Sequence, residues 1–332
     1  MSDTPLETLA FERLRNNDNC EHFADNWIDE YRVARTAVYN LLNSGVPAAE
    51  PDLTDHTEKH VRDVLRTAHE LLDGANGDLR ASDLMALVCT ILYHDVGNVI
   101  GREEHWKKIV DVFNETWPQK DAERPRLRQI VTLAGGAHAG KADDGSDDTL
   151  KDVSPVETGQ FNDKIRLRTI AAVTRFADEL AEGPQRTNRY MRTHNLIGKK
   201  SSLYHKYSSI TNIRVDRGNG RIVLTYDIDV GSIKRRKLKK LLKMAYSRVW
   251  KLNWERQLAR HYCDLLSCFK QTEATFNLTE HGVPLRLELP TIVLKDVGVL
   301  GKSPDKDLTD LFKQYRISRI VEEIRKSSGE SD

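Results

Sequence analysis

The chain has 332 residues, of which 39% are hydrophobic and 30% charged, with a formal net charge of +1. This length suits one large domain or two small ones, and the composition excludes collagen-like, disulfide-scaffold and wholly disordered chains. The most apolar stretch, Leu84–Tyr93, is far shorter than the roughly 20 residues that a membrane helix needs. We therefore expect no membrane span.

The first residues of the chain and its cysteines indicate the cellular compartment in which we expect the protein. The start, MSDTPLETLAFERL, lacks the basic and apolar regions of a secretory signal peptide. The four cysteines contain no CxxC pair, and so few cysteines in a long chain are typical of the reducing cytosol. We expect a cytoplasmic protein.

The small net charge hides a segregation along the chain. Residues 1–60 hold twelve Asp and Glu against five Lys and Arg, whereas residues 231–262 hold eleven Lys and Arg against the single acid Glu255. The acidic segment 1–60 and the basic segment 231–262 can each attract partners of opposite charge, although the whole chain is nearly neutral.

From about residue 22 to 182, apolar side chains recur at helical spacing, which predicts six helices. The first should stop before Gly45 and Pro47, and the third, Leu84–Tyr93, is apolar nearly all round and therefore central. An acidic loop rich in Gly, Asp and Ser separates the last two, at 141–163. The helices are expected at 22–42, from a cap at Thr54 or Asp55 to Gly74, from a cap at Ser82 to Tyr93, from near Glu103, from near Arg126 to Gly135-Gly136, and from Asn162 to Ala181.

After Gly183-Pro184 the pattern changes to mixed α and β. The segment SSITNIRVDRGNGRIVLTYDIDV alternates apolar and polar residues around Gly218-Asn219-Gly220, which predicts a β-hairpin. A long basic helical region, about Ser232 to Thr275, comes next, and PLRLELPTIVL supplies one or two strands. A charged helix, Leu308–Ile324, and a loose tail end the chain. The sequence therefore predicts a mainly α fold, a helical domain followed by a smaller α+β domain.

Histidines are scarce, eleven in all, and five of them stand at informative places between residues 56 and 138. Buried charge is costly unless it is paired or bound to a metal, and ligands from several helix ends can meet that cost. Nitrogen and oxygen ligands without thiolate suit Mn, Fe, Ni, Co, Zn or Mg. The candidates are His56 and His60, four apart on one helix face, His94-Asp95 directly after the apolar helix, His105 and His138 at helix ends, and Asp178 within RFADEL.

Three segments resemble the HD superfamily of metal-dependent phosphohydrolases, and the resemblance covers about residues 54–190. They are DHTEKHVRDVLRTAHELL, LVCTILYHDVGNVI and IRLRTIAAVTRFADELAEGPQR. Within the superfamily the chain is most similar to the HD domains of bacterial conflict (anti-phage) systems. The resemblance implies an N-terminal helical segment at 1–50, an HD-type phosphohydrolase core at 51–190, an α+β accessory domain at 200–300 and a charged helix and tail at 301–332.

The resemblance also implies roles for the site residues. His60, His94, Asp95 and Asp178 would hold a divalent ion, and Asp95 would also orient the nucleophile. His105 and His138 would either transfer a proton or complete a second metal centre, so that one or two ions are bound per site.

Several groups near these residues are candidates for contacting substrate phosphates. Arg175 lies one helical turn before Asp178, which makes it the best of the cations. His56 is either a substrate contact or a support for the ligands. The other candidate cations are Lys107, Lys108, Lys141 and Arg186.

The resemblance favours a deoxynucleoside triphosphate as substrate, in a nucleotide-depleting effector of phage defence. Two departures separate the chain from the usual dNTP hydrolases: Thr57-Glu58-Lys59-His60 replaces Arg-x-x-His-Ser, and Gly97-Asn98-Val99-Ile100 replaces Gly-His-x-Pro. Cyclic-nucleotide phosphodiesterases and single-strand nucleases of the superfamily remain alternatives, although their Gly-Tyr-Pro and His-His signatures are absent from this sequence.

A non-catalytic nucleotide-sensing module is the alternative from another class. In that case the basic run 234–243, with seven cations in ten positions, would be the working surface and would bind nucleic acid through phosphates. We favour the enzyme because all four metal ligands are present. A homo-oligomer and a partner protein from the same defence system are the other partners that we expect.

Overall fold

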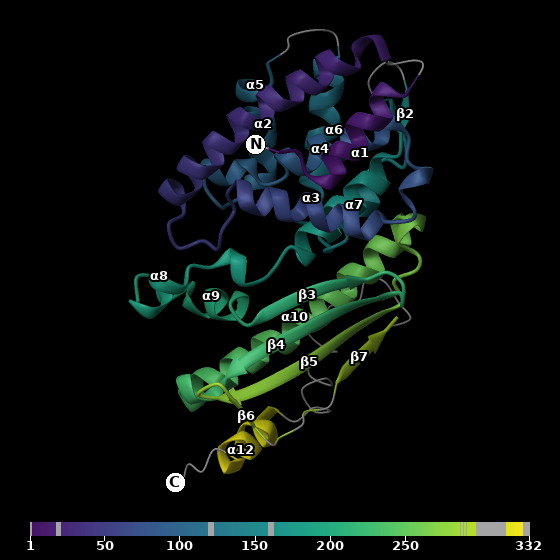
Figure 1. Cartoon of the computed structure of the whole chain (residues 1–332). Coiled ribbons are helices and arrows are strands. Elements are labelled where there is room, and N and C mark those ends of the chain that lie inside the picture. Colours follow the sequence, from purple (N-terminus) through teal and green to yellow (C-terminus); the bar gives the residue numbers. More distant parts are fainter. Residues whose placement is uncertain are drawn as a thin grey trace. The chain divides into compact units, whose positions relative to one another are not determined.

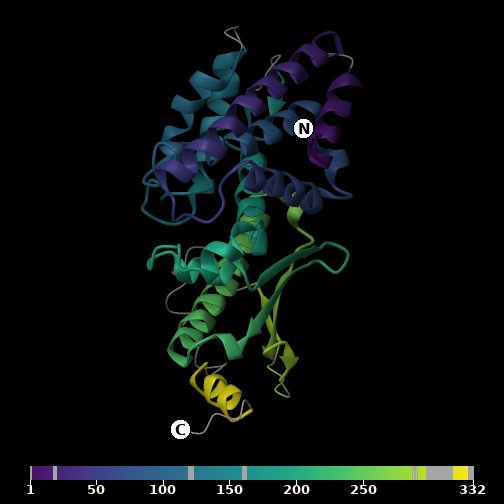
Figure 2. The ribbon, with the colours of Figure 1, turned by 60° about the vertical axis from the view of Figure 1, so that its left-hand side comes forward.

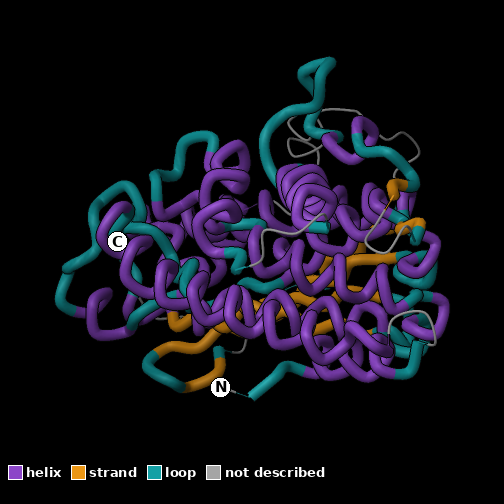
Figure 3. Tube along the Cα trace, turned by 90° about the horizontal axis from the view of Figure 1, so that it is seen from above, coloured by secondary structure: helices purple, strands orange, loops and turns teal. Residues whose placement is uncertain are grey.

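The computed structural model describes residues 2–17, 21–118, 123–158, 163–285, 287, 289, 291–296 and 317–327. Most of these residues are helical and the strands are few, so the mainly α fold with an α+β C-terminal part is confirmed (Figures 1 and 3). Contacts divide the chain into two compact units. The first, here the helical unit, is Met1–Ala181 with Leu258–Ser267, and the second, the α/β unit, is Glu182–Gln257 with Cys268–Asp332.

The helical unit is built around α4 (Ala81–Tyr93). Every side chain of α4 except that of Ser82 is buried, and α1, α2, α3, α6 and α7 all contact it, so the predicted central position is confirmed. Its other elements are α1 (Pro5–Arg15), α2 (Glu21–Ala49), α3 (Glu58–Leu72), α5 (Ile109–Thr116), α6 (Arg124–Gly136), α7 (Leu167–Leu180), the two-stranded ladder of β1 (Glu157–Thr158) and β2 (Lys164–Ile165), and 3-10 turns at Asn76–Asp78, Val96–Val99, His105–Lys108, Thr149–Asp152 and Asp264–Leu266.

Two helix ends differ from those that we predicted. Helix α2 continues through Gly45 and Pro47, because Gly45 lies so close to Val99 that a Cβ there would be 3.1 Å from the Val99 Cβ. Packing against the turn Val96–Val99 thus outweighs the local tendency of glycine and proline to end a helix. Helix α7 begins at Leu167, because Lys164–Ile165 pairs as a strand; the predicted start, Asn162, lies outside the described residues.

Two predicted caps are also wrong. The N-cap of α3 is Thr57, and Asp55 instead accepts hydrogen bonds from the backbone N–H and hydroxyl of Thr57 in the turn before the helix. In α4, Arg80 occupies the N-cap position, and the Asp83 carboxylate accepts a bond from the Arg80 backbone N–H. Ser82 lies in the first turn, where its hydroxyl donates to Asp163.

The α/β unit contains the predicted hairpin and a parallel pair of strands. Strands β3 (Thr211–Asp216) and β4 (Arg221–Asp229) are antiparallel, which confirms the hairpin. Strand β5 (Gln271–Glu280) is parallel to β4, as a helical crossover through α10 (Arg235–Tyr262) allows. The remaining elements are α8 (Arg189–Thr193), α9 (Ser202–Ser208), β6 (Val283–Pro284), β7 (Ile292–Lys295), α12 (Ile317–Ser327) and 3-10 turns at Pro184–Arg186 and Val230–Ser232.

The basic helix is shorter than predicted. It ends at Tyr262, and Gln271–Thr275, the end of the predicted helix, belongs to β5. Alternate side chains of β5 are buried, so a period of two, typical of a strand, replaces the helical period there. Of the predicted helix Leu308–Ile324, residues 308–316 lie outside the described part of the chain, and α12 covers the rest. None of the helices described has an apolar stretch long enough to cross a bilayer.

Candidate metal centre

Helix α4 ends in the interior of the helical unit, and two polar residues follow it there. It ends at Tyr93, His94 takes the C-cap position, and Asp95 precedes the 3-10 turn Val96–Val99. Because α4 is buried along its length, the residues that follow it are buried too: His94 is 0% exposed and Asp95 3%. The cost of burying these groups must be met by nearby partners.

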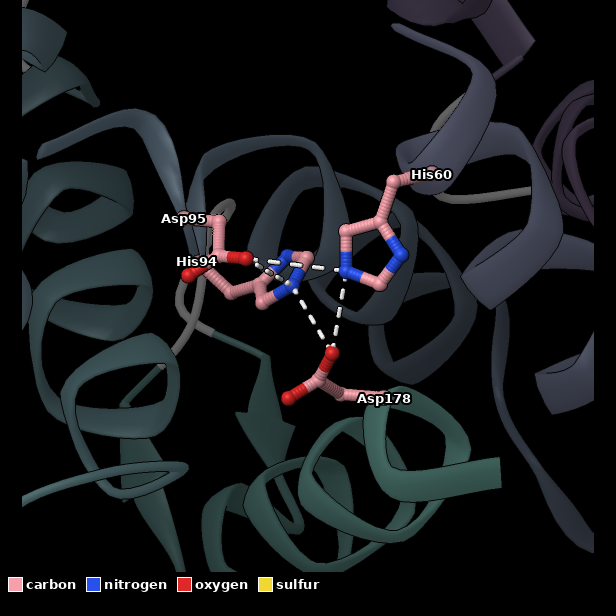
Figure 4. Close-up of side chains that lie close together, drawn as sticks. All are labelled: His60, His94, Asp95 and Asp178. Atoms are coloured by element: carbon pink, nitrogen blue, oxygen red, sulfur yellow. Dashed lines mark hydrogen bonds and ion pairs between the residues drawn. The ribbon is translucent and has the colours of Figure 1, made fainter. Parts of the chain in front are cut away.

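His60, His94, Asp95 and Asp178 converge on one point, which we call the first cluster (Figure 4). His60 comes from the start of α3 and Asp178 from the last turn of α7. The Nε2 atom of His60 lies 3.0 Å from Oδ1 of Asp178 and 3.5 Å from Oδ2 of Asp95. The Nε2 atom of His94 lies 3.6 Å from each of the same two oxygens. Four donor atoms from four places in the sequence thus surround one small volume.

A second cluster lies on the other oxygen of Asp95. The Nε2 atoms of His105 and His138 lie 3.1 and 3.4 Å from Oδ1 of Asp95, and 3.1 Å from each other. His105 opens the turn His105–Lys108, and His138 follows the end of α6. Asp95 is therefore common to both clusters and faces each with a different oxygen atom.

The imidazoles are oriented by the backbone. The Nδ1 atoms of His94, His105 and His138 lie within hydrogen-bond distance of the carbonyls of Ile91, Arg102 and Gly135, respectively. A carbonyl only accepts, so each Nδ1 donates its proton to one, and each Nε2 faces Asp95 as the nitrogen whose lone pair a metal ion would take in place of a proton. The same arrangement of outer hydrogen bonds orients histidine ligands of metal ions in proteins.

The pKa values of several side chains in the clusters differ from those of the free side chains. Burial by itself lowers the pKa of His94, but the carboxylates of Asp95 and Asp178 raise it to about 9. Burial opposes ionisation of Asp95 and Asp178, yet the surrounding imidazoles hold the pKa of both carboxyls well below the usual range. Burial lowers the pKa of His138. Both carboxylates, that of the buried Asp95 and that of the partly exposed Asp178, thus remain ionised and require positive charge beside them.

These donors fit a divalent metal ion. The buried Nε2 of His94 has no hydrogen-bond partner among the described residues, although it faces two carboxylate oxygens. A buried polar atom without such a partner is uncommon, and a metal ion would satisfy it. Both clusters offer imidazole nitrogen and carboxylate oxygen, the ligands of first-row divalent metals.

Gly97 has a structural role that sequence reasoning missed. A Cβ at Gly97 would lie 1.9 Å from the backbone oxygen of His105, so no larger residue fits unless the turn of His105 moves. Contacts between the turns Val96–Val99 and His105–Lys108 depend on this close approach. Gly97 therefore lets His105 come within reach of Asp95. Its position two residues after Asp95 was the available signal.

Two further side chains lie at the clusters. The Nε2 of His56 is 3.8 Å from Oδ2 of Asp95, and its ring centroid is 5.3 Å from that of His60, although His56 precedes α3 rather than lying on it. Arg102, which sequence reasoning missed, has its Nη1 atom 4.0 Å from Oδ1 of Asp95 and 3.1 Å from Oδ1 of Asn98. The Arg102 side chain is 48% exposed, so its guanidinium lies between the cluster and solvent.

The structure does not bring the other predicted cations together at the clusters. Lys107 pairs with Glu104 and Lys141 with Asp147, and all four are exposed. Lys108 donates to the carbonyl of Gly101. The buried Arg175 donates through Nη1 to Thr149 Oγ1, at 2.6 Å, and to the carbonyl of Ala137, next to His138. Arg186 is buried in the α/β unit.

A helical unit in which His60, the His94-Asp95 pair and Asp178 converge defines an HD-type domain. The model of the HD-CE family matches residues 50–249, which is 200 of the 332 residues, and the chain belongs to that family. The sequence resemblance to HD domains is thereby confirmed. No curated protein matches the chain. The HD-type domain and its cluster support a metal-dependent hydrolase, in general a phosphohydrolase.

Proposed function

We propose that this protein hydrolyses a phosphoester of a nucleotide, a deoxynucleoside triphosphate above all, with divalent metal ions as cofactors. The observation that carries the proposal is the pair of clusters that share Asp95. Two donor sets on opposite oxygens of one carboxylate suit a pair of ions that act on the same phosphate.

The ligand roles divide between the clusters. His60, His94, Asp178 and one oxygen of Asp95 form the first ligand set; His105, His138 and the other oxygen form the second. A divalent ion supplies a Lewis acid that activates water and neutralises charge developing on phosphorus. Four imidazoles among six ligands favour Mn, Fe, Co, Ni or Zn over Mg, which prefers oxygen.

The remaining residues would position the substrate and move protons. With a single ion, in the first cluster, His138 is free to act as a general base, because burial lowers its pKa and keeps the imidazole neutral. Arg102 is the cation best placed to hold a phosphate, since it is half-exposed and near Asp95. His56 would contact the substrate from the side of His60. Phosphate binding by Lys107, Lys141, Arg175 and Arg186 stays a prediction.

The burial of the clusters supports a small substrate. The side chains of His60, His94 and Asp95 are at most 4% exposed, whereas that of Asp178 is 24% exposed. A terminal phosphate chain can reach such a recessed group, while a base-paired backbone is too wide to do so. The proposal extends to a role as a nucleotide-depleting effector of phage defence, cytoplasmic and homo-oligomeric, with a partner protein from the same system.

The test is hydrolysis by the purified full chain of the four ribo- and four deoxyribonucleoside triphosphates, a cyclic dinucleotide and single-stranded DNA. Each is assayed with Mn, Mg, Co or Ni, and the released phosphate, diphosphate or triphosphate is separated by ion exchange. We expect metal-dependent loss of dNTPs, abolished in His94→Ala/Asp95→Ala. His69→Ala, which alters a histidine of α3 that belongs to neither cluster, is the matched control.

Two results would overturn the proposal. Cleavage of DNA or of the cyclic dinucleotide with dNTPs untouched would assign the site to another substrate. A folded protein that retains no metal and hydrolyses nothing with any of the four metals would favour the nucleotide-sensing module instead.

A further inference from the structure

The first part of the α/β unit, residues 183–215, has an unusual charge. It contains seven Lys and Arg and no Asp or Glu, in a protein whose overall net charge is +1. Helices α8 and α9 lie within it and contact each other (Figure 1). Such a concentration of positive charge without neutralising acids in the same segment raises the local electrostatic potential.

Four cations of α8 and of the turn that leads to α9 have no carboxylate partner among the described residues. No described carboxylate lies within 4.0 Å of the charged atoms of Arg189, Arg192, Lys199 or Lys200, and three of these four side chains are exposed. Partial burial and the nearby Arg189 cation lower the pKa of Arg192. Burial and the Arg192 cation likewise lower the pKa of Lys206 on α9, against the opposite effect of Asp229. Mutual repulsion of this kind would be relieved by a bound polyanion.

Large aromatic side chains lie among these cations and face solvent. Tyr190 of α8 is 64% exposed and Tyr204 of α9 is 57% exposed. The ring of Tyr190 stacks on His194 with centroids 4.0 Å apart and planes at 24°. Exposed aromatic rings beside unpaired cations are the elements with which proteins bind single-stranded nucleic acid: cations follow the phosphates and rings stack on the bases.

The backbone that carries this surface is well anchored. Tyr207 of α9 is buried, its ring lies against that of Tyr226 on β4, and Arg248 of α10 lies over it. The Thr211 hydroxyl donates to the carbonyl of Tyr207, which joins the end of α9 to β3. Helix α9, which carries Tyr204, is thus held on the core of the α/β unit. Figure 2 gives a second view of the ribbon of this unit.

We infer that the exposed face of α8 and α9 is a binding surface for single-stranded nucleic acid. The basic–aromatic face, as we call it, comprises Arg189, Tyr190 and Arg192 of α8, Lys199 and Lys200 of the turn that follows, and Tyr204 of α9. It differs from the basic run 234–243 of the sequence analysis, where Lys237 and Lys240 are exposed but no aromatic residue occurs. A membrane surface is less suited to it, because α8 and α9 have only five and seven residues and lack an extended apolar face.

The test measures binding by the full chain of a fluorescent oligonucleotide of about 15 thymidines, long enough for one site of this kind. Chelator is present so that the metal centre cannot cleave the probe. We expect saturable binding that weakens steeply between about 50 and 200 mM salt. Tyr190→Leu/Tyr204→Leu should weaken it about tenfold or more, because stacking is lost while apolar area is kept. Lys199→Gln/Lys200→Gln should weaken it and flatten its salt dependence.

The matched control is Lys237→Gln/Lys240→Gln, which removes the same charge from α10 and should weaken binding less than Lys199→Gln/Lys200→Gln. Circular dichroism and melting temperature show that each variant is folded. Equal effects of the two lysine pairs with no effect of the tyrosines would overturn the inference, since binding would then follow net charge alone. Absence of oligonucleotide binding, with or without binding to anionic phosphatidylserine vesicles, would overturn it too. Oligonucleotide binding is measured without hydrolysis, so its result tests this inference separately from the proposed function.

Discussion

The two clusters around Asp95 are built from different donors, and the difference predicts unequal affinities for metal. The first offers two imidazoles and two carboxylates, whereas the second offers two imidazoles and only the far oxygen of Asp95. Because both carboxyls are ionised, a dication in the first cluster meets more opposing negative charge. The first cluster should therefore bind metal more tightly, and the second should depend on the first through their shared carboxylate.

The supports of the clusters differ as well. The first is held by the ends of long helices, α3, α4 and α7. The second depends on the short turn that carries His105, packed on Gly97, and on the residue after α6. Arg175 and Thr149 both donate to the carbonyl of Ala137 and so fix the chain next to His138. Small changes in packing should accordingly affect the second cluster before the first.

The largest effect is expected for Asp95→Asn, which removes the charge that both clusters share. Loss of a group that only supports a ligand costs about 10- to 100-fold in metal affinity, so loss of a shared ligand should cost more. We expect metal content near zero and no detectable hydrolysis. Elemental analysis after gel filtration measures the first and phosphate release the second, with His69→Ala as control. A variant that kept both ions would show that Asp95 does not join the clusters.

His60→Ala and His138→Ala compare the clusters directly. His60→Ala removes a ligand from the first cluster, so we expect it to release the tighter ion and abolish activity. His138→Ala leaves the first cluster intact and should keep about one ion per chain while losing most activity. Titration with metal, followed by calorimetry, should give one high-affinity site in His138→Ala and none in His60→Ala. The opposite order would contradict the difference in donor charge.

The sequence allowed the fold class and the family to be predicted, because both rest on patterns within single segments. The apolar run before His94-Asp95 indicates a buried helix, and the alternation around Gly218-Asn219-Gly220 indicates a hairpin. The end of α2 was not predictable, since a contact with a distant residue decides it: Val99 lies against Gly45. The start of α3 was misassigned for a local reason, because Asp55, Thr54 and Thr57 are all good caps and Asp55 forms a turn with Thr57 instead of capping the helix.

The same limit applies to the site. The resemblance to HD domains implied that His60, His94, Asp95 and Asp178 belong together, but no local pattern shows that Asp95 faces two clusters with separate oxygens. A helical position one turn before Asp178 made Arg175 a candidate for phosphate, but the sequence gives no sign that its Nη1 donates to Thr149, and phosphate binding by Arg175 stays a prediction. Arg102 was overlooked because its nearness to Asp95 results from a turn that the sequence does not reveal.

Gly97→Ala tests the support of the second cluster. The added methyl group cannot be accommodated 1.9 Å from the His105 oxygen, so the turn must move away from Asp95. We expect a loss of about 1–3 kcal/mol in the free energy of unfolding, and loss of the weaker ion with the tighter one retained. Gly136→Ala is the matched control, because its nearest neighbour would be 3.8 Å away, an ordinary contact. Denaturant unfolding and metal analysis of both variants decide the point.

The smallest effect should come from the cations around the second cluster, and it separates Arg102 from its neighbours. Arg102→Ala removes a half-exposed guanidinium 4.0 Å from Asp95. We expect KM to rise by up to about tenfold and kcat to change less, because a group that holds a phosphate equally in the ground and transition states contributes to binding rather than to the chemical step. Lys107→Ala removes a solvent-exposed charge that is paired with Glu104, and should change neither constant measurably nor stability by more than about 0.5 kcal/mol. Equal kinetics for the two variants would mean that proximity to Asp95 gives Arg102 no part in binding, and that the substrate phosphates are held by the clusters themselves.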